Sequence, residues 1–341
     1  MRAGPGPKVR RCGWCHDGGM AESDPVTDQR GLPQHETEAQ FFVATRYGRR
    51  ASRLRLLGAG EWSQAYAFTL DGRQSVIRFG RHGEDFLKDQ VMAAYSSADL
   101  PVPAVRETGR AADGYFAVSD RAPGRLLNDL DGVAMRAALP GLLRALDALR
   151  AVKIPGVDGY GIWAPGSAAS AATWPHALLA VSQETARVPG WRTALAASPI
   201  GPSAFGVGYA RLQELVTGLP QSRHVIHGDL ANRNVLAEGT RITAVIDWGN
   251  ALYGDYLYDA AWLIYWWPWF PAWHDIDISR ELRQHWDRTD GTPADLDHRL
   301  LTYLIHIGLD AMTYDAFKRR QDDLARNATR VLALAQTLPA T

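Results

Sequence analysis

The chain has 341 residues and carries 37 basic and 37 acidic side chains, so its formal net charge is zero. Hydrophobic residues make up 46% of the sequence and charged residues 22%, which is typical of a globular protein and excludes global disorder. Without a basic excess, the chain is not suited to general binding of nucleic acid. Its length predicts one large two-lobed domain or two small domains.

The hydropathy pattern predicts no membrane association. The most apolar stretch, residues 260–273, is too short to span a bilayer and is interrupted by Pro268 and Pro271. The basic N-terminus is not followed by the apolar segment that a secretory signal requires. We therefore expect a cytoplasmic protein.

The first 35 residues are rich in Gly, Pro and charge, which predicts a disordered tail. They contain both cysteines, Cys12 and Cys15, in a Cys-x-x-Cys-His run that elsewhere binds haem or zinc or carries redox chemistry. No export signal or further ligand accompanies them, so we interpret these cysteines as incidental. Met20 is an alternative start of translation.

The next part of the chain predicts a small β-rich lobe over residues 36–121. The expected elements are strands at residues 53–57, 65–70, 75–79 and 115–119, with a helix at residues 84–98. Asp71-Gly72 is a hairpin turn signal, and the prolines at 101 and 103 stop the helix. Helical patterns dominate from Leu139 onward, after which residues 155–173 are expected to form a surface loop. The chain is therefore expected to have an α+β fold, with a larger helical lobe over residues 122–341.

The residues that carry chemistry lie between His224 and Asp259. An apolar strand leads into His227-Gly228-Asp229-Leu230-Ala231-Asn232-Arg233-Asn234, and a hairpin of two further apolar strands then delivers Asp247. This topology places Asp229, Asn234 and Asp247 together at strand ends. Their oxygens suit Mg²⁺, which takes one or two carboxylates and completes its shell with phosphates. A carboxylate left off the metal can accept a hydroxyl proton, so the set is equipped for phosphoryl transfer to an alcohol.

The pattern His-Gly-Asp-x-x-x-x-Asn, followed by a hydrophobic hairpin and Ile-Asp-Trp, resembles that of the aminoglycoside phosphotransferases, which are relatives of the protein kinases. The resemblance implies a protein-kinase-like bilobal fold, with Asp229 as the catalytic base. It implies Asn234 and Asp247 as Mg²⁺ ligands and His227 as a support of the loop. Asp259 is expected to be structural and to tie down the same loop.

Residues 241–248, the tryptophan run ending at Trp269 and residues 307–310 are similar to the branch of this family that phosphorylates the 4-hydroxyl of hygromycin B. The similarity extends, with gaps, from about residue 56 to residue 315. It implies an antibiotic-resistance enzyme that uses ATP or GTP with Mg²⁺ and takes a cationic aminoglycoside as its acceptor. We expect a monomer.

The nucleotide site is less distinct in the sequence. Gly58, Gly60 and Ser63 lie in a turn between two strands, where backbone N–H groups can face phosphates, although an isolated Gly-x-Gly is usually an ordinary hairpin. In place of the kinase Lys–Glu pair, this chain has Arg78 on the third strand and Asp89 on the next helix. Ser119 and Arg121 fall at the expected hinge, where the alternative is a plain linker.

The acceptor site is expected in the helical lobe because the overall neutrality hides a local charge. Residues 229–315 contain 14 acidic and 6 basic side chains, a net charge of −8, which would attract a small cation. Trp262, Trp266 and Trp269 fall on one helical face. We assign Trp262 to the core and name Trp266, Trp269 and Asp310 as candidate substrate-binding residues, because aromatic faces and carboxylates attract ammonium groups.

Two alternatives stay open from the sequence. The first is a kinase of another small alcohol, such as choline, homoserine or a different aminoglycoside, because one fold serves many substrates. The second is a catalytically silent nucleotide-binding scaffold, favoured by the replacement of the Lys–Glu pair with Arg78 and Asp89. The sequence defines neither the hydroxyl that is phosphorylated nor the choice between ATP and GTP.

Overall fold

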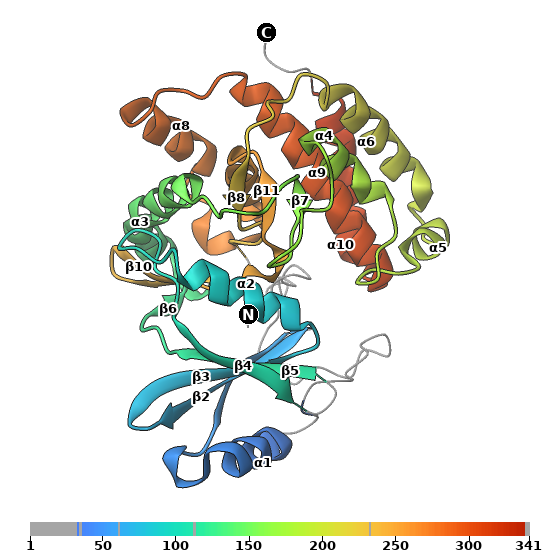
Figure 1. The fold of residues 1–341 in the computed structure, drawn as a ribbon. Coiled ribbons are helices and arrows are strands. Elements are labelled where there is room, and N and C mark those ends of the chain that lie inside the picture. Colours follow the sequence, from blue (N-terminus) through green and yellow to red (C-terminus); the bar gives the residue numbers. More distant parts are fainter. Residues whose placement is uncertain (1–32, 34–35, 61, 112–113, 232, 338–341) are drawn as a thin grey trace, which may run out of the picture.

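The computed structural model describes residues 33, 36–60, 62–111, 114–231 and 233–337. The expected tail, including Cys12, Cys15 and Met20, lies outside these residues apart from residue 33. The described chain forms a small lobe built on one sheet and a larger, mainly helical lobe (Figure 1). The α+β, two-lobed fold expected from the sequence is therefore confirmed.

The small lobe is built on a five-stranded antiparallel sheet with the spatial order β1-β2-β3-β5-β4. Its strands are β1 (Arg55–Ala59), β2 (Ser63–Leu70), β3 (Arg73–Gly80), β4 (Val105–Ala111) and β5 (Gly114–Asp120). The expected hairpin turn is present, since Asp71 and Gly72 both have positive φ, as a two-residue turn with right-handed strand twist requires.

Two helices cover the two faces of this sheet. Helix α1 (Glu36–Tyr47) packs its buried side on one face, where Val43 joins Phe68, Ile77 and Phe116 in a separate core. Helix α2 (Gly83–Ala93) lies on the other face, between the sheet and the large lobe (Figure 1). Helix α2 is therefore placed to contact both lobes at once.

The sequence-based boundaries are wrong in several places. The helix expected at residues 84–98 ends at Ala93, because the Ser96 and Ser97 hydroxyls accept the N–H groups of Val102 and Leu100 and so replace helical bonding. The first strand, expected at residues 53–57, lies two residues later, at Arg55–Ala59. Helix α1 and strand β4 were not predicted from the sequence. The expected loop at residues 155–173 contains the short strand β7 (Gly161–Ile162).

The large lobe combines helices with two three-stranded sheets of order β10-β9-β6 and β7-β11-β8. Its remaining strands are β6 (Arg125–Leu126), β8 (His224–Ile226), β9 (Val235–Glu238), β10 (Arg241–Val245) and β11 (Leu252–Gly254). Its helices are α3 (Gly132–Ala151), α4 (Trp174–Leu179), α5 (Trp191–Ala196), α6 (Gly201–Leu215), α7 (Leu257–Trp266), α8 (Ile278–Arg288), α9 (Leu296–Phe317) and α10 (Gln321–Ala335).

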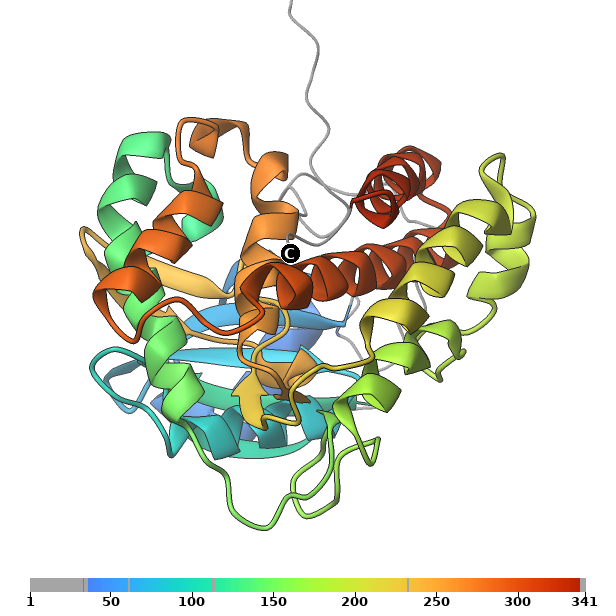
Figure 2. The same cartoon turned by 90° about the horizontal axis from the view of Figure 1, so that it is seen from above.

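Helix α3 begins seven residues earlier than expected, because Asp131 caps it by accepting the N–H of Ala134. Helix α9 crosses the middle of the lobe, with α3 and α8 on one side and α5 and α6 on the other (Figure 2). Helix α7 is buried on nearly all sides and packs against α9. None of the described helices combines the length and apolar character that a membrane crossing requires.

Candidate active site

Asp229 lies in the loop between β8 and β9 and is buried, with 6% of its surface exposed. Asn234 Nδ2 donates to the Asp229 carbonyl at 2.9 Å and to its Oδ2 at 3.1 Å, and Asn250 Nδ2 donates to the same Oδ2 at 3.3 Å. Two amide groups therefore fix the orientation of this carboxylate, and both remain hydrogen-bond donors at any pH at which the protein folds.

Asp259, on α7, holds the start of this loop. Its carboxylate accepts the backbone N–H groups of His227 and Gly228, both at 2.8 Å. Burial raises the pKa of Asp259 to about 7, although these two N–H donors lower it. Asp259 thus lies under the loop that carries Asp229 and accepts two of its backbone N–H groups.

Gly228 is required by the backbone conformation of the loop. Its φ is +72°, and a Cβ there would lie 2.9 Å from Leu252 Cδ2. Only glycine adopts this conformation without strain and leaves room for β11. The loop is also held by Asn128, which donates to the Ala231 carbonyl and accepts the N–H of Arg233.

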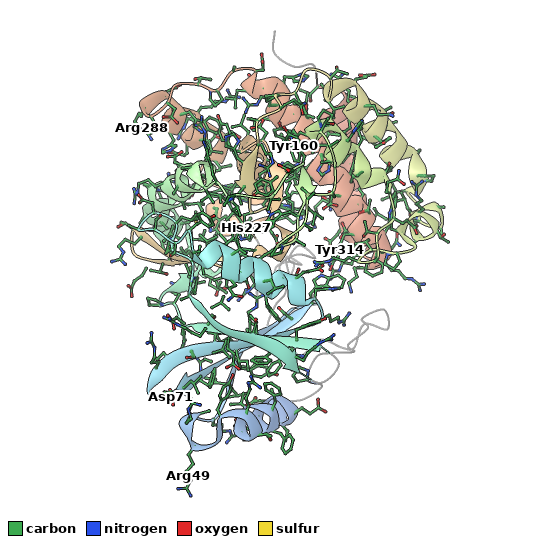
Figure 3. The ribbon with its side chains drawn as sticks, in the orientation of Figure 1. Arg49, Asp71, Tyr160, His227, Arg288 and Tyr314 are labelled. Atoms are coloured by element: carbon green, nitrogen blue, oxygen red, sulfur yellow. The ribbon has the colours of Figure 1, made fainter. Side chains whose placement is uncertain are left out.

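His227 joins the loop to the strand that delivers Asp247. Its Nε2 lies 3.0 Å from the Ile246 carbonyl, which can only accept, so Nε2 carries the proton. Burial lowers the pKa of His227 to about 4, and its ring lies 4.6 Å from that of Trp248. His227 is therefore a neutral structural donor. Figure 3 shows it at the edge of the large lobe that faces α2.

Asp247 follows β10 in a left-handed conformation, with φ 63° and ψ 67°. The Ile246 N–H donates to the Asn234 carbonyl at 2.8 Å, which brings Asp247 beside the loop of Asp229. The Asp247 side chain is 42% exposed, and its Oδ1 accepts from Arg78 Nη2 at 3.0 Å. Two segments of the site that are separate in the sequence therefore meet through backbone hydrogen bonds.

The donor set of Asn234 and Asp247 fits a magnesium ion. Asn234 uses its amide nitrogen on Asp229, so its oxygen is the end that can face a metal. Arg78 occupies one oxygen of Asp247 and leaves the other. Among the described residues, no three His, Cys, Asp or Glu side chains form a metal cluster.

Arg78 and Asp89 form the ion pair that replaces the kinase Lys–Glu pair. Arg78 Nη1 lies 2.7 Å from Asp89 Oδ2, and both side chains are less than 15% exposed. Burial lowers the pKa of Arg78, but the Asp247 and Asp89 carboxylates raise it by more than burial lowers it. The guanidinium therefore stays charged. Burial raises the pKa of Asp89 to about 6, against the effect of Arg78. A fixed cation on β3 therefore points toward Asp247.

The other nucleotide candidates lie on the small lobe and at the hinge. In the β1–β2 turn, the Gly60 N–H donates to the Ser63 carbonyl at 2.8 Å, and a Cβ on Gly58 would meet no atom within 4 Å. Ser119 pairs opposite Val76 in the sheet. The Arg121 N–H donates to the Gln74 carbonyl at 3.1 Å, which holds the start of the hinge against β3. These residues stay candidates for nucleotide binding.

The tryptophans expected on one helical face do contact one another. Trp262 and Trp266 have ring centroids 5.9 Å apart, and Trp266 and Trp269 are 5.1 Å apart. Trp262 and Trp266 are 3% and 4% exposed, so most of their surface packs in the core. The guanidinium groups of Arg330 and Arg326 lie 5.1 and 5.7 Å from the ring of Trp269. Two cations on this ring argue against its use for a polycationic acceptor.

Asp310 lies on α9 and is half-buried, and burial raises its pKa to about 6. Burial raises the pKa of Tyr258, and the charge of Asp310 raises it further. The Tyr258 hydroxyl itself lies 2.9 Å from His306 Nδ1. Asp310 stays the candidate for acceptor binding in the large lobe, whereas the burial of Trp266 favours a place in the core.

Three residues that organise the site were not predicted from the sequence. Asn128 and Asn250 both hold the loop of Asp229, and Lys88 binds the segment that follows Asp247. Asn250 could have been found, because it lies only three residues beyond Asp247. Asn128 and Lys88 reach the site from distant segments, and no local pattern marks them.

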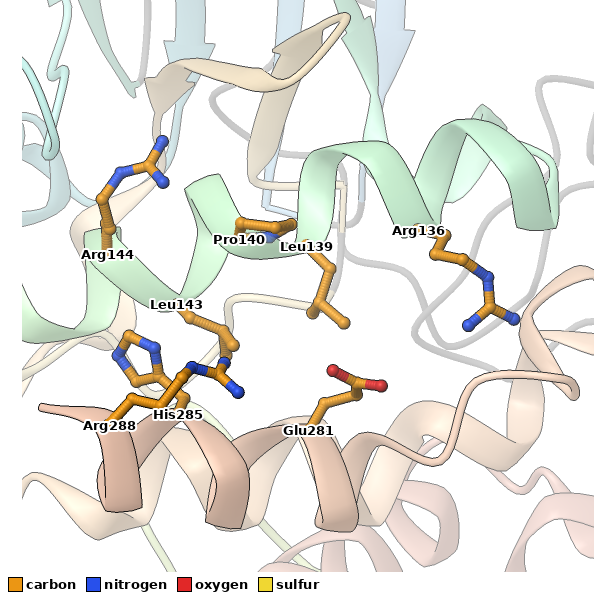
Figure 4. A pocket seen from close by; sticks show the side chains of 8 residues that line it. All are labelled: Arg136, Leu139, Pro140, Leu143, Arg144, Glu281, His285 and Arg288. Atoms are coloured by element: carbon orange, nitrogen blue, oxygen red, sulfur yellow. The ribbon is translucent and has the colours of Figure 1, made fainter. Parts of the chain in front are cut away.

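A shallow pocket of about 150 Å³ lies elsewhere in the large lobe, between α3 and α8 (Figure 4). Its lining combines aliphatic and charged side chains, namely Arg136, Leu139, Pro140, Leu143, Arg144, Glu281, His285 and Arg288. None of these residues belongs to the candidate active site. The pocket is therefore not assigned to the reaction.

The two-lobed fold, with Asp229, Asn234 and Asp247 at the junction of the lobes, is the protein-kinase-like fold of the aminoglycoside phosphotransferases. Residues 53–296 match the phosphotransferase enzyme family that includes the aminoglycoside phosphotransferases. The chain belongs to this family, as the sequence motifs predicted.

Individual members of the family are similar to this chain in sequence or in structure. The chain is 30% identical over 291 residues to hygromycin-B 4-O-kinase of Escherichia coli, covering 85% of this chain and 82% of that protein. Aminoglycoside phosphotransferase APH(4)-Ia has a TM-score of 0.78 at 28% identity, covering 89% of this chain and 99% of that one. Its thermostable mutant in ternary complex with AMP-PNP and hygromycin B has a TM-score of 0.76 at 28% identity, with coverages of 88% and 98%.

Proposed function

We propose that this protein is an ATP-dependent kinase that phosphorylates a hydroxyl of an aminoglycoside. The proposed acceptor is hygromycin B, modified at its 4-hydroxyl, which would confer resistance. The observation that carries this proposal is the set of Asp229, Asn234 and Asp247, which the fold assembles within a sequence related to a hygromycin kinase. Base and metal ligands are the minimum equipment for in-line phosphoryl transfer.

In the proposed reaction, the acceptor hydroxyl oxygen attacks the γ-phosphorus of ATP, the bond to the β–γ bridging oxygen breaks, and ADP leaves. Asp229 accepts the hydroxyl proton, with its carboxylate held by Asn234 and Asn250. Arg78 places a fixed cation toward the phosphates. Mg²⁺ held by Asn234 and Asp247 would neutralise charge on the phosphates when bound.

The acceptor is proposed to bind on the large lobe. Residues 229–315 carry a net charge of −8, which favours the approach of a cationic antibiotic. Asp310 is the proposed contact in this region. The charge also favours an aminoglycoside over homoserine, which carries both a positive and a negative group.

The intact catalytic set favours an enzyme over a silent scaffold. Asp229 is buried, and its carboxylate accepts hydrogen bonds from two side-chain amides. Arg78 and Asp89 form an ion pair with the same charges as the kinase Lys–Glu pair. A scaffold would have no need of an oriented base. A cytoplasmic, monomeric enzyme stays our prediction.

The test is ADP release with MgATP and MgGTP across a panel of hygromycin B, other aminoglycosides, choline and homoserine. We expect turnover that depends on hygromycin B, with NMR placing the new phosphate on the 4-hydroxyl. Turnover with another acceptor alone would replace the proposed substrate. No stimulated turnover with any acceptor would favour the scaffold.

A further inference from the structure

Lys88 is a lysine of α2 that is 1% exposed. Its Nζ donates to the Gly249 carbonyl at 2.8 Å and to the Ala251 carbonyl at 3.0 Å. It also lies 5.5 Å from the centroid of the Trp163 ring. A buried ammonium is costly unless its donors are satisfied, and these two carbonyls and the aromatic face satisfy it.

Burial lowers the pKa of Lys88 to about 8, with the charge of Asp85 acting in the opposite direction. The side chain is therefore still cationic at neutral pH. Its hydrogen bonds in the described part of the chain go to backbone carbonyls. Lys88 thus acts on the conformation of residues 249–251, the segment that directly follows Asp247.

The neighbouring residue of the same helix binds the other side of this segment. Asp89 Oδ1 accepts the Trp248 N–H at 2.9 Å, while its Oδ2 holds Arg78. A Cβ on Gly249 would lie 2.8 Å from Asp85 Cγ, so the helix and the turn are in direct contact. Two consecutive residues of α2 therefore make three hydrogen bonds to residues 248–251.

Helix α2 has an independent attachment to the large lobe. Arg187 Nη2 lies 2.6 Å from Asp85 Oδ1 and 2.8 Å from Glu84 Oε1. Loss of the Lys88 ammonium would therefore leave the helix docked. Its effect is confined to the turn beside Asp247.

We propose that Lys88 is a positioning residue that fixes the turn after Asp247 and thereby sets the position of the Asp247 carboxylate. The reading of Asp247 as a metal ligand rests on the proposed function. The contact itself does not, because it is a property of the nucleotide-free protein. Lys88→Met would keep the length and apolar stem of the side chain and remove its hydrogen-bond donors. Lys88→Arg would keep hydrogen-bond donors and the positive charge.

The experiment measures amide hydrogen exchange of the full chain without nucleotide, in the wild type and in Lys88→Met, Lys88→Arg and Lys153→Met. Lys153 is exposed two residues beyond the end of α3 and serves as the matched control. We expect exchange in residues 247–252 to be about tenfold faster in Lys88→Met, since the turn loses hydrogen bonds. Exchange in α9 should be unchanged, Lys88→Arg should restore slow exchange, and Lys153→Met should match the wild type.

A second readout is the Mg²⁺ concentration that gives half-maximal turnover. We expect it to rise about tenfold in Lys88→Met while the KM for the acceptor stays the same. Wild-type exchange rates in Lys88→Met, or faster exchange throughout α9 as well, would overturn the proposal. If the wild type transfers phosphate to no acceptor, the proposed function fails, and the exchange rates still decide whether Lys88 holds the turn.

Discussion

Replacing His227 by glutamine should remove an acid-sensitive element from the catalytic loop. His227 is fully buried and neutral, and its Nε2 donates to the Ile246 carbonyl at 3.0 Å. The glutamine amide places an N–H at nearly the same distance from the backbone but does not titrate. The substitution therefore separates the hydrogen bond from the protonation of the side chain.

The magnitude follows from the pKa of His227, which burial lowers from 6.5 to about 4 in the folded protein. Between these values the unfolded chain binds a proton that the folded protein does not. Stability from this group is therefore present above pH 6.5 and is lost as the pH falls toward 4. Between pH 7 and pH 5, the loss amounts to about 2 kcal/mol.

The assay is urea unfolding of the wild type and His227→Gln at pH 7 and pH 5. We expect the free energy of unfolding of the wild type to decrease between these pH values by about 2 kcal/mol more than that of the variant. His176→Gln, at an exposed position, should behave as the wild type. Equal losses in the wild type and His227→Gln would refute the assignment of a buried neutral imidazole.

Three further substitutions test the site. Asp259→Asn should reduce the free energy of unfolding by about 1–3 kcal/mol and lower kcat more than it changes KM, because one N–H of the loop then faces an amide nitrogen. Urea unfolding measures the stability and steady-state kinetics measure kcat and KM. An unchanged kcat would contradict the anchoring role of Asp259. Gly228→Ala should cost at least about 1–2 kcal/mol in the same unfolding assay, since its φ is +72° and Leu252 blocks a Cβ; wild-type stability would mean that the loop adopts another conformation. Asp310→Asn should raise the KM for hygromycin B about tenfold, by loss of a charge contact, and leave the KM for ATP unchanged. A rise in the KM for ATP instead would indicate that Asp310 belongs to the nucleotide-binding site.

The hairpin that carries the candidate catalytic residues was predictable because its geometry is local. Asp229, Asn234 and Asp247 lie within 19 consecutive residues, and two short apolar strands with one turn leave few ways to arrange them. The hairpin turn at Asp71-Gly72 was predictable for the same reason. In both cases the hydrophobic pattern fixes the strands, and the turn residues fix how they return.

Contacts between distant segments were not predictable from pattern. Arg78 on β3 and Asp247 after β10 are 169 residues apart, and the packing of the two lobes against each other brings them together. Lys88 is almost fully buried, and no pattern in the sequence marks it. The tryptophan stripe was recognised, but the arginines of α10 that cover Trp269 follow it by about 60 residues.

The most direct measurement is transfer of labelled γ-phosphate from ATP to hygromycin B by the wild type and by Asp229→Ala, together with nucleotide binding by both. We predict phosphorylated hygromycin B with the wild type and at least a roughly hundredfold lower rate with Asp229→Ala, because the general base is lost. Folding and nucleotide affinity should be retained. Undiminished transfer by Asp229→Ala, or no transfer to hygromycin B by the wild type, would contradict the proposed function.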